Sequence, residues 1–170
     1  MEPRNLRGAQ RGRTVARAGA AILAAAGLLG LSACGESESP VGWTQWQVTR
    51  IYQDPETPAD LPETQEGRLF LVIGEDSLTG ASGCLNLKAD VQWREKESQL
   101  EVGQLSVEEI GGESQCAPSD ERNAERLRDV LENQTLTYTR DGGRSLRLQQ
   151  FHPDAPEWET PKSLSMVSRA

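Results

Sequence analysis

Regular alternation of apolar and polar residues is the feature that most constrains the fold of this 170-residue chain. In the clearest case, every second residue is apolar: Leu85, Leu87, Ala89, Val91 and Trp93. Successive side chains of a strand point to opposite faces, so this pattern predicts a strand that is buried on one face and exposed on the other.

Shorter runs of the same kind recur along the chain. Candidate strands lie at residues 46–52, 69–73, 100–102, 105–110, 135–139, 145–151 and 164–167. In the first of them, Trp46, Val48 and Tyr52 alternate with polar residues, so their side chains are expected to share one buried face of the strand. Asp141-Gly142-Gly143 is typical of a hairpin turn, and the three prolines of residues 55–66 predict a loop. Residues 76–80 are expected to form a polar turn that leads into a strand.

One segment has helical spacing instead. Between Ser119 and Asn133, the apolar residues Ala124, Leu127, Val130 and Leu131 recur at intervals of three and four. Ser119 is expected to cap the first turn. About seven or eight strands with a single late helix predict an α+β domain. Its mostly antiparallel sheet, or partial barrel, would have the helix packed on it.

The N-terminal segment predicts export and lipid attachment. Five arginines precede the apolar run Ala18–Leu31, and the small residues Ser32 and Ala33 lead to Cys34. This order resembles a bacterial lipoprotein signal, in which residues 1–33 are removed and Cys34 is acylated. The alternative is a buried N-terminal helix. The expected location is the cell membrane, with the protein lipid-anchored on its extracytoplasmic face.

The charge distribution agrees with attachment through lipid. Residues 1–33 carry five arginines and one glutamate and the whole chain carries −8, so residues 34–170 carry −12. A domain this acidic lacks the cationic surface that nucleic-acid binding needs, and anionic lipid would repel it. The membrane contact is therefore expected at Cys34 alone. Residues 34–42 are predicted to be a flexible tether and residues 43–168 the folded domain.

Two cysteines remain in the predicted mature chain, Cys84 and Cys116. An even number in an oxidising compartment predicts a disulfide bond between them. Two free buried thiols remain an alternative. A zinc site is disfavoured because His152 is the only histidine and no second cysteine pair exists.

No group of residues predicts catalysis or a cofactor. No Gly-x-Ser-x-Gly motif surrounds a serine, so His152 is interpreted as a loop residue rather than a member of a triad. Glu108, Glu109 and Glu113 are interpreted as a solvated acidic surface. Residues 76–80 lack the spacing of a calcium loop, and no metal site is predicted. Trp158 does not alternate in step with apolar neighbours, as Trp46 and Trp93 do. It is therefore the candidate for an exposed contact residue.

The order of these features resembles the META domain, a family that includes HslJ-like proteins. The matching residues are Trp46, Gly80-Ala81-Ser82-Gly83-Cys84-Leu85-Asn86, Cys116 before the helix, Tyr138 and Leu146-Arg147-Leu148. The resemblance covers residues 43–168 and implies a small β-rich domain with one helix, often exported or lipidated. It implies no catalytic residues, and it connects the chain with the cell envelope and its stress response.

The sequence thus predicts a non-enzymatic, membrane-anchored lipoprotein that acts as a binding or accessory module, with an unknown envelope protein as its partner. The alternative is an exported hydrolase or protease inhibitor whose site is built from residues distant in sequence. A deep polar cleft with His152 or two close carboxylates would favour that alternative. A third interpretation is a structural component of the envelope.

Overall fold

The computed structural model describes residues 39–65, 67–110, 116–156 and 158–168. The predicted leader, Cys34 and residues 35–38 of the predicted tether lie outside these residues. The strands are β1 (Gln45–Tyr52), β2 (Leu69–Ile73), β3 (Ser77–Ser82), β4 (Leu85–Arg94), β5 (Gln99–Val102), β6 (Ser106–Glu109), β7 (Thr135–Asp141), β8 (Ser145–Gln150) and β9 (Ser163–Ser168). The helices are α1 (Pro118–Leu131) and the 3₁₀ turns η1 (Glu63–Gln65) and η2 (Glu95–Glu97).

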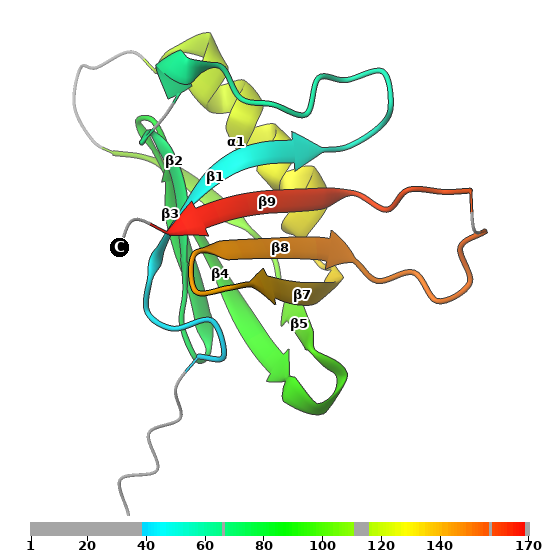
Figure 1. Cartoon of the computed structure of the whole chain (residues 1–170). Coiled ribbons are helices and arrows are strands. Elements are labelled where there is room, and N and C mark those ends of the chain that lie inside the picture. The colour runs from blue at the N-terminus through cyan, green and yellow to red at the C-terminus, as the bar shows by residue number, and fades with distance from the viewer. Residues whose placement is uncertain (1–38, 66, 111–115, 157, 169–170) are drawn as a thin grey trace, which may run out of the picture. The chain divides into compact units, whose positions relative to one another are not determined.

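Eight of the strands close into an antiparallel barrel, and Figure 1 shows four of them (β1, β9, β8 and β7) side by side. The order around the barrel is β1-β2-β3-β4-β5-β7-β8-β9, and β9 pairs with β1 to complete the circle. Closure pairs strands that would otherwise expose backbone groups at the edge of a sheet. The predicted α+β class, an antiparallel sheet or partial barrel with one packed helix, is confirmed, and the structure shows that the barrel is closed.

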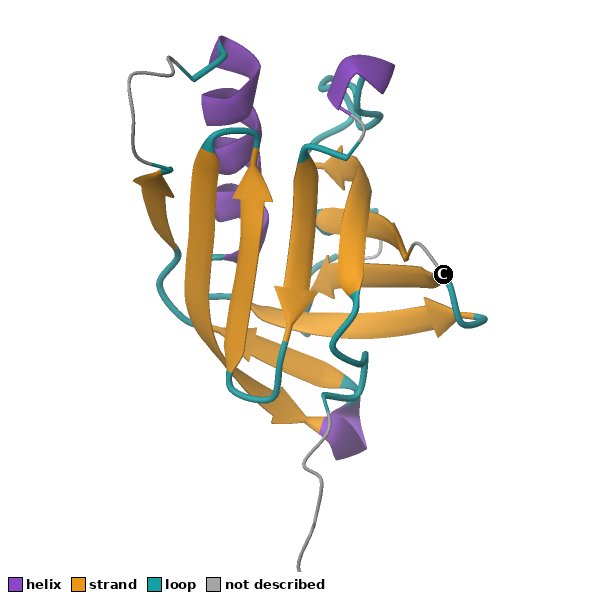
Figure 2. Cartoon of the chain, turned by 90° about the vertical axis from the view of Figure 1, so that its left-hand side faces the viewer, coloured by secondary structure: helices purple, strands orange, loops and turns teal. Residues whose placement is uncertain are grey.

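Strand β6 is the one described strand outside the circle. It pairs with the first half of the long β4, whereas β5 pairs with the second half. Figure 2 shows it as the short strand at the left edge, beside the long β4. Glu108 and Glu109 of β6 are exposed, and such charges discourage further pairing at a free edge.

Apolar side chains from every barrel strand fill its interior, as expected for a barrel of eight strands. The fully buried members include Trp46, Leu71, Leu78, Leu87, Leu100, Leu136, Leu148 and Leu164. Helix α1 packs against β1, β3, β4 and β8, and its buried residues Ala124, Leu127, Val130 and Leu131 join the same core. These are the four apolar positions from which the helix was predicted.

Two local features of the sheet differ from the prediction. The register of β1 against β9 shifts between Val48 and Arg50, so Ile51 rather than Tyr52 follows Val48 into the core. Such a bulge reverses the phase of the remaining residues of a strand. Residues 77–80, predicted to be part of a turn, belong to strand β3. A Cβ on Gly80 would overlap the backbone of Phe70, so a small residue is needed there.

The boundaries of the domain and of the helix also need correction. Ser39 and Val41 are 4% and 1% exposed, so the packed chain begins at or before Ser39, within the predicted tether. Helix α1 is capped by Ala117, and Ser119 is the second helical residue rather than the cap. The Ser119 hydroxyl instead accepts a hydrogen bond from Gln65 (3.1 Å).

Candidate functional site

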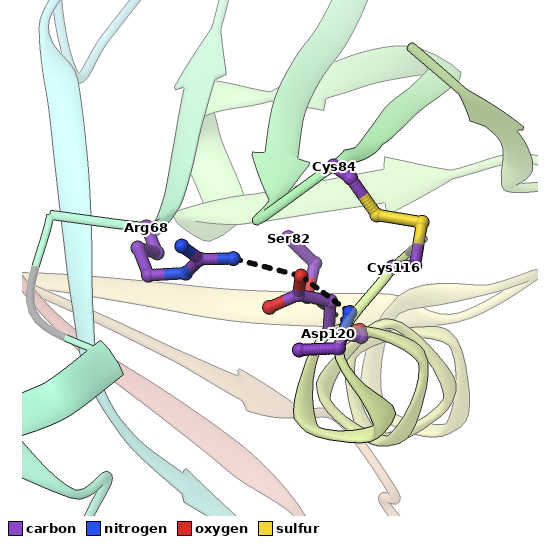
Figure 3. The surroundings of a disulfide bond; sticks show 6 residues. Arg68, Ser82, Cys84, Cys116 and Asp120 are labelled. Carbon is purple, nitrogen blue, oxygen red and sulfur yellow. Dashed lines mark hydrogen bonds and ion pairs between the residues drawn. A yellow bond between two sulfur atoms is a disulfide. The ribbon is translucent and has the colours of Figure 1, made fainter. Parts of the chain in front are cut away.

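A disulfide bond joins the β3–β4 turn to the start of helix α1. Cys84 and Cys116 are bonded with Cα atoms 5.6 Å apart, a usual separation for a disulfide. The predicted pairing is therefore confirmed. Figure 3 shows the bond beside the first turn of α1.

A buried carboxylate lies next to this disulfide. Asp120 is 1% exposed, and its Oδ2 lies 2.8 Å from Nη2 of Arg68. The same oxygen accepts a hydrogen bond from the backbone N–H of Ala117 (3.3 Å), which is one half of a capping box. The Ser82 hydroxyl donates to the carbonyl of Asp120 (2.6 Å), and Figure 3 shows these groups gathered between β3 and the helix.

The turn residue Gly83 fits closely against this carboxylate. It has a φ of +60°, and a Cβ at this position would overlap the Asp120 side chain. Glycine is thus required by both backbone conformation and packing. The disulfide holds the helix start to the β3–β4 turn, and the Arg68–Asp120 pair holds it to the residue before β2. Among the described residues, Asp120 Oδ1 has no hydrogen-bond partner. We interpret the cluster as structural, because Arg68, Ser82 and the Ala117 N–H all bind the other polar atoms of Asp120.

A second polar network ties the other end of the helix to two long loops. Asp129 accepts hydrogen bonds from Lys162 (2.6 Å) and Gln53 (2.8 Å), and Arg126 donates to Gln53 (2.9 Å) and to the carbonyl of Ile51 (2.6 Å). Burial raises the pKa of Asp129, but the hydrogen bonds from Lys162 and Gln53 outweigh it and lower the pKa overall. Burial also lowers the pKa of Arg126. The network holds Gln53, which follows β1, and Lys162, which precedes β9, against the helix.

The aromatic residues near the N-terminal end of β1 divide between core and surface. Trp46 is fully buried, whereas Trp43 is 67% exposed and lies over Gly74. Trp93 donates from its indole N–H to the carbonyl of Gly74 (2.8 Å) and meets Tyr138 edge to face, with ring centroids 5.2 Å apart. Trp46 and Trp93 thus pack against the core, as their alternation with polar residues in the sequence predicts.

The structure does not gather the other residues singled out from the sequence. Trp158 is 84% exposed, as a contact residue must be, and its role in a contact stays a prediction. His152 is an exposed loop residue. Glu108 and Glu109 lie on β6, and Glu113 falls outside the described residues. In the described part of the chain, no three His, Cys, Asp or Glu side chains are arranged to hold a metal ion.

The outer surface of the barrel carries several hollows. The largest we describe has a volume of about 590 Å³ and is lined by Asp76, Asp90 and Glu101 at the point where β5 and β6 part along β4. Glu101 accepts a hydrogen bond from Arg94 (2.6 Å), and Asp76 and Asp90 are exposed. Asp76 and Asp90 are open to solvent, whereas the acid of a hydrolase is typically held in a desolvated site. This hollow therefore gives little support to the hydrolase alternative.

A second hollow, of about 380 Å³, lies over strand β9 and is called the β9 groove below. Its lining includes Arg50, Tyr52, Asp60, Arg147, Ser163 and Ser165, with Ala59 and Thr160 at its end. Arg50 and Arg147 both face Ser165 in register, one from β1 and one from β8. The sequence does not predict this arrangement, because no pattern within one segment shows which strands become neighbours.

Comparisons with known proteins support the fold alone. No protein-family model matches the sequence, and no curated protein matches it. The structure is similar to the NMR structure of a protein from Burkholderia xenovorans, with a TM-score of 0.51 and 14% sequence identity. That similarity covers 75% of this chain and 82% of the other. The class defined by these observations is a closed, eight-stranded antiparallel barrel with one extra strand and one packed helix.

Among the described residues, no helix is long and apolar enough to cross a lipid bilayer.

Proposed function

We propose that this chain is a non-enzymatic lipoprotein, anchored through Cys34 on the extracytoplasmic face of the cell membrane, whose barrel is a META-like binding or accessory module of the envelope. The anchor is supported by the sequence order of arginines, apolar run and Ser32-Ala33-Cys34. The META assignment is supported by the matching residues and by an element order that agrees with a small β-rich domain.

The single structural observation that carries the binding role is the filled interior of the barrel. Apolar side chains from all eight strands occupy it, and the helix adds four more to the same core. Larger barrels bind ligands inside, but a filled one presents its binding groups on the outside. The described hollows lie on that outer surface, which favours recognition of a partner over enclosed catalysis.

The disulfide agrees with an extracytoplasmic location. Disulfide bonds form and persist in oxidising compartments and are rare where thiols are kept reduced. The bond between Cys84 and Cys116 also leaves Cys34 as the one cysteine of the chain available for acylation.

The anchor is tested by expressing the full chain and a Cys34→Ala variant in a bacterial host and partitioning each between water and detergent. We expect the wild type in the detergent phase and the variant either in the aqueous phase or retained as an unprocessed precursor. Cys84→Ser with Cys116→Ser is the matched control, since it removes two cysteines and leaves Cys34. Equal partitioning of the wild type and of a Cys34→Ala chain that has also lost residues 1–33 would rule out the lipid anchor.

A further inference from the structure

The β9 groove places two arginines on either side of a small residue. Arg50 of β1 pairs in register with Ser165 of β9, and Ser165 pairs in register with Arg147 of β8. Adjacent strands lie about 4.8 Å apart, so the two arginines start roughly 10 Å apart on the same outer face. Side chains of this length can converge from that separation on one small group above Ser165. Figure 1 shows β1, β9 and β8 side by side, with both long loops leaving from the same end.

The floor of the groove is small and polar. Ser163 and Ser165 alternate with the buried Leu164 and Met166, so both serines face outward while their neighbours fill the core. Nη2 of Arg147 donates a hydrogen bond to Oγ of Ser163 (3.2 Å), which turns the guanidinium toward β9. Ser163 is only 3% exposed, so this contact lies at the bottom of the groove.

The remaining donors of the two arginines are not consumed by carboxylates. In the described part of the chain, Arg147 forms no ion pair within 4.0 Å. Arg50 uses its Nε for Asp60 at 2.6 Å, in a pair whose side chains are 63% and 75% exposed. Exposed pairs of this kind are weak, and a guanidinium carries five N–H donors. The groove therefore retains unused donors and a net charge of +1 from Arg50, Arg147 and Asp60.

This local charge is opposite to that of the rest of the domain. Residues 34–170 carry −12 in total, whereas the groove carries +1. The acidic domain around this single positive charge would repel a polyanion, so nucleic acid is a poor candidate for the ligand. It suits a ligand with a single anionic group on an otherwise polar body. Planar guanidinium groups pair well with the oxygens of phosphate and carboxylate.

We propose that the β9 groove binds a small ligand through one phosphate or carboxylate group, held between Arg50 and Arg147 above Ser165. The hydroxyls of Ser165 and Tyr52 contact the polar body of the ligand beside that group, while Ser163 holds the Arg147 guanidinium. This assignment deepens the proposed binding role by naming the chemistry of its ligand, and it rests on that role. Cys34 takes no part in it.

The test uses the full chain in neutral detergent at low ionic strength, where surface charges are least screened. Inorganic phosphate is titrated while backbone amide shifts of β8 and β9 are followed by NMR. In parallel, glucuronate is compared with glucose, which has the same ring without the carboxylate. We expect saturable shifts around Ser165 with phosphate or glucuronate, at a Kd on the order of 1 mM, and none with glucose. If phosphate binds more tightly than glucuronate, the charged group of the ligand is a phosphate; if glucuronate binds more tightly, it is a carboxylate.

Three variants separate the groove from general charge effects. Arg147→Gln is expected to weaken anion binding at least about tenfold, because it removes a charge-assisted contact. Ser165→Met keeps both arginines and should weaken binding similarly by filling the floor. Arg144→Gln changes the net charge equally on the exposed β7–β8 turn, outside the groove, and should bind within about twofold of the wild type.

Absence of saturable shifts, equal binding by Arg147→Gln and the wild type, or equal losses in Arg144→Gln and Arg147→Gln would each overturn the proposal. The assay does not depend on acylation of Cys34. A chain that partitions into detergent but binds no anion therefore retains the anchor and loses the groove. A chain that binds phosphate but is not acylated retains the groove and loses the anchored role.

Discussion

Gly83 lies so close to Asp120 that a Cβ on the glycine would overlap the aspartate carboxylate, which is itself 1% exposed. The contact joins the β3–β4 turn to the first turn of helix α1, where the disulfide also lies. Backbone conformation, packing and a covalent bond thus all fix the helix to the barrel at one place. This arrangement is best tested by its effect on stability.

Gly83→Ala should destabilise the domain by about 2–4 kcal/mol, because it adds a steric overlap to the cost of a positive φ. Gly142 provides a matched control. Its φ is +64°, but a Cβ there would meet nothing within 4 Å. Gly142→Ala should therefore cost only about 1 kcal/mol. Urea unfolding measures both, and equal losses would show that the contact with Asp120 contributes nothing.

Removing Arg68 should leave the Asp120 carboxylate buried without its cation. Arg68→Gln is expected to lower the free energy of unfolding by about 1–3 kcal/mol, less than for a fully buried pair because the Arg68 side chain is 47% exposed. Arg128→Gln is the control, since Arg128 lies 4.0 Å from Glu132 on the helix surface. Its expected loss is about 0.5 kcal/mol or less. A loss in Arg68→Gln no larger than the control's would contradict this account.

The disulfide closes a sequence separation of 32 residues, which includes the extra strand β6. Chain-entropy arithmetic assigns such a crosslink about 3–4 kcal/mol. The Cys84→Ser, Cys116→Ser double variant should therefore unfold at a clearly lower urea concentration than the wild type. Adding reductant to the wild type should shift its midpoint toward that of the variant. An unchanged midpoint in both cases would mean that the bond does not stabilise the barrel.

Asp129 should make part of the stability depend on pH. Its pKa is lower in the folded chain than its ordinary value, so its contribution is present above about pH 4 and fades as the pH falls through the folded pKa. Asp129→Asn should cost about 1 kcal/mol or less at neutral pH, because the side chain is 40% exposed, and nothing near pH 2.

The matched control for this prediction is Asp154→Asn, which removes an exposed carboxylate from the loop of residues 151–162. It should change stability little at either pH. If the loss in Asp129→Asn stayed constant from pH 7 to pH 2, the contacts with Lys162 and Gln53 would not depend on the ionised carboxylate.

Much of the fold follows from local patterns, and what was missed has identifiable causes. The alternation of residues 85–94 predicts β4, and the spacing of Ala124, Leu127 and Val130 predicts α1. Strand β3 was missed because its residues 79–82 are small or polar and show no apolar alternation. The bulge in β1 was missed because one extra residue shifts the phase without any mark in the sequence.

The candidate sites also divide into one that the sequence predicts and one that it does not. Compartment and an even number of cysteines were sufficient to predict the pairing of Cys84 with Cys116. The β9 groove could not be predicted, because Arg50 and Arg147 are 97 positions apart and meet only through their separate registers with Ser165. Closure of the barrel creates that relationship, and closure is a property of the whole sheet. Long-range register is thus the information that local patterns lack.

The central claim is that the barrel is held at the membrane through Cys34. Mass spectrometry of the protein extracted from bacterial membranes, both intact and after proteolytic digestion without reduction, tests it most directly. We predict a chain that begins at Cys34, lacks residues 1–33 and carries the added mass of acyl chains on its N-terminal peptide. Cys84 and Cys116 should be recovered in one disulfide-linked pair of peptides. A chain that retains residues 1–33, or an N-terminal peptide with unmodified Cys34, would contradict the account.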